Sequence, residues 1–258
     1  WAARSPGMPS FKGKTALITA APSGIGRAVA EHLALQGAGR LILVDRDGDA
    51  LERLVLAPCE VSLRVGDVRA EALWDAIEPE LGPLDHAVIN AGVAGASAIA
   101  SHDFDQWRYI LSVNLDGAFL TLRTAMRAMR GRGGSIVLTA SAAGVKAEPG
   151  VAAYGCAKAA LIHLAKVAAK EGASDNIRVN AIAPAGVETP VWDAVPMFAQ
   201  RAAEIGRDAA FAEMAKLATP LGRYAKAEEV AAQIAFLLGE QSALTTGTVL
   251  ISDGGYTL

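Results

Sequence analysis

Short apolar runs alternate with longer amphipathic stretches along the chain. The apolar runs predict seven strands, at residues 15–19, 41–45, 61–65, 85–90, 135–139, 177–182 and 248–252. Stretches with helical spacing cover residues 25–36, 71–80, 104–130, 151–171, 198–216 and 228–238. Strands separated by helices indicate βαβ units, which form a parallel sheet with helices on both faces. We therefore predict an α/β fold with a doubly wound sheet of the Rossmann type.

Bulk properties suit one folded domain. The chain has 258 residues, of which 52% are hydrophobic, as expected when strands are buried on both faces. No long linker divides the chain, so residues 8–258 are predicted to form a single domain. Residues 1–7 precede Met8 and lack the features of a signal peptide; we interpret them as an expression remnant. Residues 190–220 contain no predicted strand and indicate a lid that covers the substrate.

Charge and residue content exclude several classes of function. The net charge is −3, so nucleic-acid binding has no basic excess behind it, and no apolar run reaches transmembrane length. We expect neither nucleic-acid nor membrane partners, and the cytoplasm as the default location. Cys59 and Cys156 are interpreted as small buried residues in a reducing compartment. The four histidines lack metal-ligand spacing, and we predict no metal site.

A turn that contains glycines connects the first predicted strand to a helix. It consists of Ser23, Gly24, Ile25 and Gly26. Free backbone N–H groups at a helix N-terminus bind a pyrophosphate, and glycines let the phosphate approach the backbone. Considered alone, such a turn more often only closes a strand–helix joint. Its position directly after the first strand favours dinucleotide binding.

Asp45 ends the second strand, where an acidic side chain binds the adenosine ribose hydroxyls of a dinucleotide. A 2′-phosphate would meet this charge at a cost of about 4 kcal/mol near a protein surface. Asp45 therefore favours NAD over NADP, although the adjacent Arg46 offsets part of the repulsion. The alternative is an ordinary aspartate that caps the next turn.

Polar residues also follow the third and fourth predicted strands. Asp67 comes after the third strand, and Asn90, Ala91 and Gly92 come after the fourth. These are also common turn residues. Their placement at the carboxyl ends of strands, where open α/β sheets bind ligands, favours a site there.

Tyr154 and Lys158 share one face of a predicted helix. A phenol has a pKa near ~10, which a neighbouring ammonium lowers. Lowering it to neutrality requires about 4 kcal/mol, which a buried lysine and a positive nicotinamide ring together supply. Ser141 follows the fifth strand, where its hydroxyl is placed to stabilise charge on a substrate oxygen. Alone, the Tyr–Lys pair is usually structural and Ser141 a helix cap.

Asn114 lies inside a predicted helix, where asparagine is a poor helix former. Such a residue is either exposed or functional. From the residue alone, we favour an exposed position.

Taken together, these residues resemble the short-chain dehydrogenase/reductase family over essentially all of Met8 to Leu258. The resemblance implies a seven-stranded parallel sheet, a homotetramer, and oxidoreduction of an alcohol or ketone with a nicotinamide cofactor. It implies that Tyr154 exchanges the proton and that Lys158 lowers the pKa of Tyr154 and binds the nicotinamide ribose. It further implies that Ser141 positions the substrate oxygen and that Asn114 supports a water in a proton relay.

The resemblance also assigns cofactor contacts at the carboxyl edge. Asp67 and Val68 would flank the adenine. Asn90 and Gly92 would lie under the cofactor, and Pro184, Val187 and Thr189 would lie near the nicotinamide carboxamide. The segment Asp253-Gly254-Gly255 resembles the C-terminal signature of the family.

Ala20 and Ala185 stand where the family usually has glycine. An alanine forced to a positive φ costs roughly 1–2 kcal/mol. We therefore expect that neither alanine adopts the left-handed conformation in this protein.

Rival functions lack their motifs. No serine lies in the G-x-S-x-G elbow of a hydrolase, and no G-x4-G-K-[ST] loop follows a strand as in nucleotide triphosphatases.

We predict an NAD-dependent dehydrogenase of secondary alcohols. The alternatives are an NADPH-dependent carbonyl or 3-oxoacyl reductase, and a non-catalytic dinucleotide-binding scaffold, since fold alone does not determine function. An apolar, mobile cover suited to a bulky alcohol is predicted from Trp192, Met197, Phe198 and Phe211.

Overall fold

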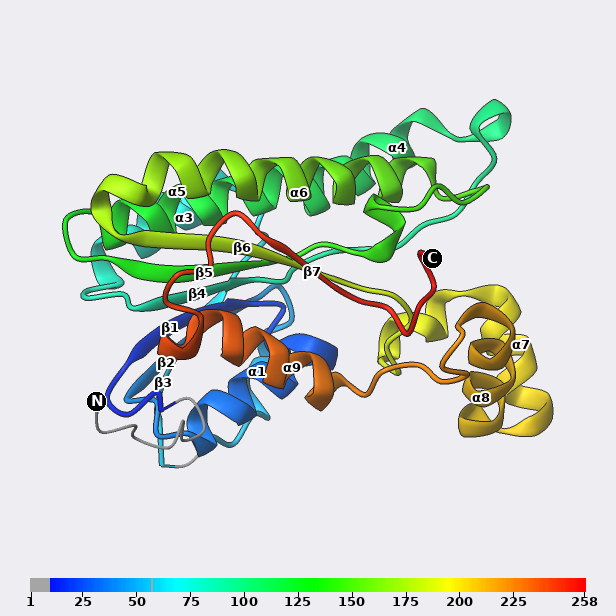
Figure 1. The fold of residues 1–258 in the computed structure, drawn as a ribbon, viewed down its shortest axis with the longest axis horizontal. Helices are drawn as coiled ribbons and strands as arrows, with labels where there is room; N and C mark the ends of the chain where they lie inside the picture. The colour runs from blue at the N-terminus through cyan, green and yellow to red at the C-terminus, as the bar shows by residue number, and fades with distance from the viewer. Residues whose placement is uncertain (1–9, 57) are drawn as a thin grey trace.

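The strands assemble into one seven-stranded parallel sheet (Figure 1). In the computed structural model, which describes residues 10–56 and 58–258, they lie in the order β3-β2-β1-β4-β5-β6-β7. The strands are β1 (Thr15–Thr19), β2 (Arg40–Asp45), β3 (Glu60–Val65), β4 (His86–Ile89), β5 (Gly134–Thr139), β6 (Ile177–Pro184) and β7 (Val249–Ser252). Each neighbouring pair is parallel. The predicted doubly wound α/β fold is therefore confirmed. The expression remnant expected at residues 1–7 lies outside the described residues.

Helices cover both faces of the sheet (Figure 1). One face carries α3 (Glu71–Ile77), α4 (Phe104–Leu111), α5 (Gly117–Met129) and α6 (Ala152–Gly172), and the other carries α1 (Gly24–Leu35) and α9 (Ala227–Leu238). A short helix, α2 (Gly48–Glu52), was not predicted. It begins because the Asp47 side chain accepts the backbone N–H of Ala50 at 2.9 Å, as an N-cap does.

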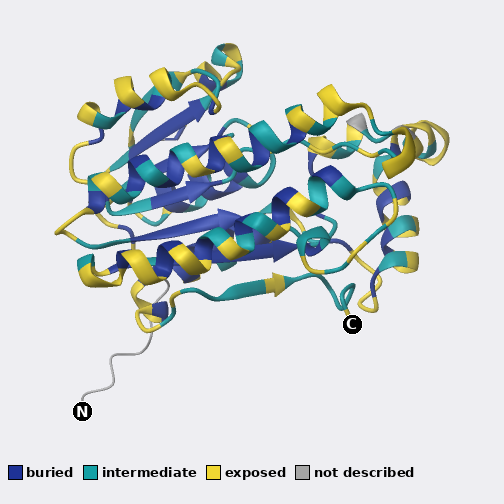
Figure 2. Cartoon of the chain, turned by 90° about the horizontal axis from the view of Figure 1, so that it is seen from above, coloured by how far each residue is buried: buried dark blue, intermediate teal, exposed yellow. Residues whose placement is uncertain are grey.

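Alternate strand residues point to opposite faces, so the inner strands contribute to two cores. Leu17, Ile42 and Ile136 join the core beneath α5 and α6. Their neighbours Ile18, Leu43 and Val137 join the core beneath α1 and α9. The inner strands of the sheet, β1, β2, β4, β5 and β6, are accordingly the most buried part of the molecule (Figure 2). Because the strand interiors are filled with apolar side chains, chemistry is left to the strand ends.

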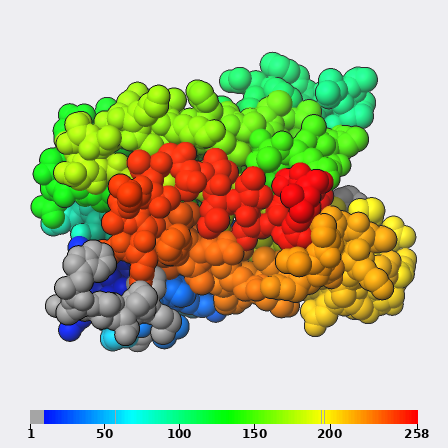
Figure 3. Space-filling model, viewed as in Figure 1, coloured from blue at the N-terminus to red at the C-terminus, as the bar shows by residue number. Residues whose placement is uncertain are grey.

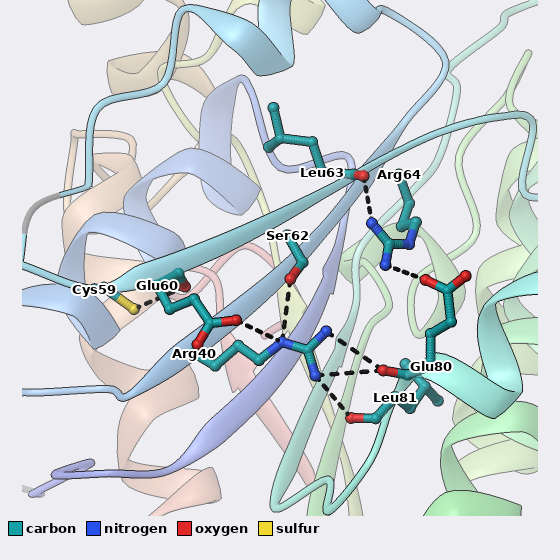
Figure 4. A network of polar contacts seen from close by, with 8 residues as sticks. All are labelled: Arg40, Cys59, Glu60, Ser62, Leu63, Arg64, Glu80 and Leu81. Carbon is teal, nitrogen blue, oxygen red and sulfur yellow. Dashed lines mark hydrogen bonds and ion pairs between the residues drawn. The ribbon is translucent and has the colours of Figure 1, made fainter.

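Arginine networks hold the amino edge of the sheet. Arg40, at the start of β2, donates to Ser62 Oγ at 3.1 Å and to the carbonyls of Glu80 and Leu81 at 3.3 Å (Figure 4). Arg178, at the start of β6, donates at 2.8–3.3 Å to acceptors at the end of α9 and in the turn beyond it: Leu237 O, Leu238 O, Gly239 O, Ser242 Oγ and Thr245 O. These contacts satisfy carbonyls that a helix C-terminus leaves unpaired.

Candidate active site

The turn between β1 and α1 brings strand and helix close together. Ala20 has a φ of +53° and Gly24 a φ of +52°. The expectation that Ala20 avoids the left-handed region is therefore wrong, whereas Ala185 is not among the positive-φ residues of the described chain. A Cβ on Gly26 would lie 2.1 Å from the Ala20 carbonyl oxygen, so only glycine fits there. The close packing of Gly26 on the Ala20 carbonyl thus holds Ala20 at a φ that alanine ordinarily avoids.

Ser23, Gly24, Ile25 and Gly26 lie at the start of α1, as predicted. Ser23 is the N-cap residue, but its side chain makes no capping hydrogen bond. The first backbone amides of the helix are thus left for an anionic ligand.

Asn90 connects the end of β4 to the end of β1. Its backbone N–H donates to Thr19 Oγ1 at 2.9 Å, and the N–H of Ala91 donates to the same oxygen at 3.0 Å. A Cβ on Gly26 would lie 3.0 Å from Asn90 Nδ2. The segment that the resemblance places under the cofactor therefore lies beside the glycine turn.

The adenosine end of the site carries more charge than we predicted. Asp45 ends β2 and accepts the N–H of Asp47 at 2.9 Å. Asp67 forms a two-pronged ion pair with Arg69, at 3.0 and 2.6 Å, which lowers the pKa of the Asp67 carboxyl. Tyr109 of α4 accepts a hydrogen bond from Arg46 at 3.3 Å, and the Arg69 guanidinium lies 5.2 Å from its ring centroid. Two acids and two guanidiniums thus surround Tyr109 and the end of β2.

Val68, next to Asp67, is buried. Its carbonyl accepts the indole N–H of Trp74 at 2.8 Å. A Cβ on Gly117 would lie 2.7 Å from Val68 Cγ2, so α5 packs directly on this loop.

Tyr154, Lys158 and Ser141 meet at the carboxyl edge. Tyr154 and Lys158 belong to the first turns of α6, and Ser141 follows β5. Lys158 Nζ donates to the Thr139 carbonyl at 2.8 Å and lies 5.5 Å from the Tyr154 ring centroid. A Cβ on Gly144 would lie 2.6 Å from the Lys158 carbonyl carbon. Glycine therefore lets the loop after Ser141 pack on α6 beside the Tyr–Lys pair.

Burial determines the ionisation of this cluster. Burial raises the pKa of the Tyr154 phenol, and the hydrogen bond with Ser141 offsets only part of this effect. Burial also lowers the pKa of Lys158 to about 8. The direction for Tyr154 is opposite to our expectation, because desolvation of the phenol outweighs the effect of its neighbours. The residues of the chain alone thus keep Tyr154 protonated at neutral pH.

Asn114 is buried with no exposed surface, so the exposed position favoured from the residue alone is wrong. A π-helical turn at Ser112–Asp116 places its side chain, whose Nδ2 donates to the carbonyls of Val93 and Ile110 at 2.8 and 2.9 Å. Asn114 Oδ1 is buried and has no hydrogen-bond partner among the described residues. A Cβ on Gly92 would lie 2.6 Å from this oxygen and 3.3 Å from Lys158 Nζ. Asn114 and Lys158 therefore flank the same side of Gly92.

The loop after β6 approaches the glycine turn from the other side. Pro184 ends β6, and Val187 and Thr189 beyond it are buried. A Cβ on Gly24 would lie 3.3 Å from Thr189 Cβ. Arg207 donates to the Thr189 carbonyl at 2.8 Å, which fixes this loop to α8. Of the three residues predicted to lie near the nicotinamide, Thr189 thus lies beside the glycine turn.

The segment 190–220 forms α7 (Pro196–Ile205) and α8 (Arg207–Ala218). The prediction of an aromatic cover is only partly correct. Phe198 and Phe211 are buried against each other, with ring centroids 4.3 Å apart, in a small core of this segment itself. Met197 is 68% exposed. Trp192 stacks on Tyr224 at 5.4 Å and packs against the same core, so three of the four residues stabilise the segment instead of lining its surface.

Among residues 10–56 and 58–258, no group of three or more His, Cys, Asp or Glu side chains is placed to hold a metal ion. Within the same ranges, no helix is long and apolar enough to cross a membrane. Cys156 is exposed and Cys59 half-buried, both as free thiols, so the interpretation as buried residues holds for neither.

Sequence reasoning missed Arg69, Tyr109 and Arg207. Tyr109 and Arg207 reach the site through contacts between elements far apart in the chain. No spacing pattern announces such contacts. Only Arg69 had a local signal, since it lies two residues after Asp67.

The site fits a nicotinamide dinucleotide. Uncapped amides and side-chain-free glycines lie at the start of α1, an acid lies at the end of β2, and the cluster of Ser141, Tyr154 and Lys158 lies further along the same edge. Hydride transfer between an alcohol or ketone and such a cofactor needs these parts on one edge of a doubly wound sheet, so they define a class of dinucleotide-dependent oxidoreductases.

Within that class, the chain belongs to the short-chain dehydrogenase/reductase family. A family model described as Enoyl-(Acyl carrier protein) reductase matches residues 19–257. The chain is 34% identical to the 3-oxoacyl-(acyl-carrier-protein) reductase FabG of Thermotoga maritima, covering 96% of this chain and 99% of that protein. It is 34% identical to a 3beta-hydroxysteroid dehydrogenase of Mediterraneibacter gnavus, covering 97% of both.

A solved structure supports the same assignment. L-sorbose reductase from Gluconobacter frateurii, complexed with NADPH and L-sorbose, superposes with a TM-score of 0.89 and 30% identity, covering 97% of this chain and 99% of that chain. These relatives differ widely in substrate, yet all are named reductases or dehydrogenases. The protein is accordingly an oxidoreductase of alcohol or ketone substrates that uses a nicotinamide dinucleotide.

Proposed function

We propose that the protein interconverts a secondary alcohol and a ketone with NAD, and that Tyr154 is its general acid and base. The observation that carries this proposal is the meeting of Ser141, Tyr154 and Lys158 at the edge that also holds the glycine turn. A proton-exchanging phenol thereby lies on the side of the sheet where the nicotinamide would lie.

In oxidation, the substrate hydroxyl lies between the hydroxyls of Ser141 and Tyr154. Tyr154 accepts the hydroxyl proton as a phenolate, while Ser141 donates a hydrogen bond to the substrate oxygen. NAD supplies the hydride acceptor and a positive charge near the phenolate. In reduction, Tyr154 donates its proton to the ketone oxygen. The raised pKa of Tyr154 favours this protonated form at neutral pH, so oxidation should accelerate as the pH rises.

Lys158 and Asn114 would serve Tyr154 rather than the substrate directly. The Lys158 ammonium would stabilise the phenolate and hold the nicotinamide ribose. Asn114 Oδ1, which accepts no hydrogen bond from the described residues, lies on the Lys158 side of Gly92. It is suited to hold a water that passes the proton on to solvent.

NAD is proposed over NADP because Asp45 ends β2, where an acidic side chain would bind the adenosine ribose. Asp67 and Val68 would flank the adenine, and Pro184, Val187 and Thr189 the carboxamide. NADPH is the second candidate, because the Arg46 and Arg69 guanidiniums both contact Tyr109 and could bind a 2′-phosphate. A relative in complex with NADPH belongs to the same family.

We propose that the segment 190–220 forms a lid over the substrate. We also propose that this segment belongs to a single domain at residues 8–258. We propose a bulky, apolar secondary alcohol as substrate, since Trp192 lies at the root of this segment.

The family resemblance supports a homotetramer. Exposed apolar residues on α9 and β7, Phe236 and Ile251, give it surface to bury. Two free thiols suit the reducing cytoplasm.

The test is turnover of a panel of secondary alcohols, followed by the absorbance of the reduced cofactor, with NAD and NADP in parallel. The variant Tyr154→Phe should lose about 10³-fold in kcat while still binding NADH, as expected for loss of a general acid/base. Binding of NADH without turnover by the wild type would instead support the scaffold alternative. Tighter binding of NADPH than NADH would support the second cofactor.

A further inference from the structure

The C-terminal strap, residues 253–258, crosses from the segment 190–220 to the loop that precedes α6. Figure 1 shows the end of the chain between these two parts, and Figure 3 shows it at the surface there. The strap is ordered by Asp253, whose carboxylate accepts the N–H of Gly255 at 2.9 Å and the N–H and hydroxyl of Thr257 at 2.8 and 2.6 Å. It is therefore a folded turn with a defined position.

One side of the strap is tied to the end of the 190–220 segment. The N–H of Leu221 donates to the Gly254 carbonyl at 3.0 Å. Gly255 has a φ of +89°, and a Cβ there would lie 2.9 Å from Pro220 Cγ. A side chain at this position would push the strap away from Pro220, so glycine permits the contact.

The other side is tied to the loop between Ser141 and Tyr154. Lys146 Nζ donates to the Tyr256 carbonyl at 2.9 Å and lies 4.4 Å from the Tyr256 ring centroid. It also lies 3.8 Å from the Glu148 carboxylate. Lys146 thus holds the strap by its ammonium, with a hydrogen bond and a cation–π contact, while Glu148 of the same loop pairs with that ammonium.

We propose that Lys146 is a positioning residue, which latches the C-terminal strap across one end of the substrate site and limits the size of alcohol that the site accepts. This inference rests on the proposed function. The loop that carries Lys146 runs directly from Ser141 to Tyr154, and the opposite anchor is the segment proposed as the lid. A strap fixed to both therefore closes the gap between two walls of the site.

Removing the latch should loosen substrate binding without touching proton transfer. In Lys146→Met, KM for the best small alcohol should rise about fivefold, as expected for loss of a partly exposed charged contact, while kcat and its pH profile stay unchanged. Bulkier alcohols should gain in kcat/KM relative to small ones. Lys146→Arg preserves the cation and should restore wild-type values. Lys166→Met, at an exposed position of α6, is the matched control.

Hydrogen exchange gives a readout independent of activity. Amides of residues 142–151 and 253–258 should exchange faster in Lys146→Met and in Tyr256→Ala than in the control. Equal exchange and equal KM in Lys146→Met and Lys166→Met would overturn the latch, as would an unchanged ratio of kcat/KM between bulkier and smaller alcohols. Absence of wild-type turnover on every alcohol would refute the proposed function instead, and the exchange result would still decide whether the latch exists.

Discussion

The two edges of the sheet both bury charged or polar side chains, but in different ways. At the amino edge, Arg40 and Arg178 each donate to several carbonyls and hydroxyls. At the carboxyl edge, the buried Lys158 ammonium donates to one carbonyl, and Asn114 Oδ1 has no partner among the described residues. Ala20 adds backbone strain on that side. Stability is thus concentrated at one edge, and incompletely satisfied groups at the edge where ligands bind.

His86 is an exception to this difference between the two edges. It lies at the amino edge, yet its Nδ1 is buried without a partner in the part of the chain that the structure describes. Burial lowers its pKa to about 4, so it stays neutral at physiological pH. An unsatisfied neutral imidazole costs less than an unsatisfied charge. What distinguishes the carboxyl edge is therefore the burial of a cation with few partners.

The largest effect should come from Lys158→Met, which removes that cation. We expect kcat to fall about 10³-fold, since the phenolate of Tyr154 loses its stabilising charge. Steady-state rates with NAD and an accepted alcohol measure this loss. The control is Lys166→Met, an exposed change on the same helix, which should keep wild-type rates. Comparable rates in both variants would contradict the role given to Lys158.

The same variant should be more stable than the wild type. Lys158 has a pKa of about 8 against an ordinary value of 10.5, so the unfolded chain binds its proton more strongly than the folded protein. Wild-type stability should therefore rise as the pH increases from 8 to 10.5, and this rise should be smaller in Lys158→Met. At pH 7 the variant should gain about 2 kcal/mol in urea unfolding. A loss of stability would show that the buried ammonium supports the fold.

Arg178→Met should have the opposite effect. Removing the guanidinium leaves carbonyls at the end of α9 unpaired, which should cost about 3 kcal/mol in the free energy of unfolding. Because Arg178 lies at the amino edge, kcat and KM should stay unchanged at temperatures where the variant is folded. Arg130→Met, at an exposed position, provides the baseline in the same urea titration. A loss below 1 kcal/mol would mean that water replaces these contacts at little cost.

Sequence patterns predicted the features that depend on periodicity and on position along a strand. The seven strands follow from apolar runs, and the place of Ser141 at the carboxyl edge follows from its position after a parallel strand. The pairing of Tyr154 with Lys158 follows from their spacing on one helix. None of these conclusions requires knowledge of side-chain packing. The family resemblance then related these residues to a common chemistry.

Features that depend on packing between distant elements were not predictable. Phe198 and Phe211 are apolar, as expected of residues that cover a substrate, yet they are buried against each other. From the sequence, Asn114 is expected to be an exposed helix residue. In the structure, the π-helical turn directs its side chain inward. The raised pKa of Tyr154 likewise follows from desolvation, which no spacing of residues discloses.

Ala20→Gly should give the smallest effect, because it tests only the backbone strain at the carboxyl edge of the sheet. Alanine at a φ of +53° costs roughly 1–2 kcal/mol, whereas glycine adds about 0.5–1 kcal/mol of conformational entropy to the unfolded chain. The variant should therefore gain about 1 kcal/mol or slightly less in stability, measured as a rise in thermal midpoint. Its affinity for NADH should not change, because the turn keeps its geometry.

Ala185→Gly is the matched control, since Ala185 lacks a positive φ. Only the entropy effect operates there, so this variant should lose about 0.5–1 kcal/mol. The two substitutions are chemically identical and should shift the thermal midpoint in opposite directions. Equal losses would show that Ala20 is not strained, and the carboxyl edge would then differ from the amino edge only in its buried polar groups.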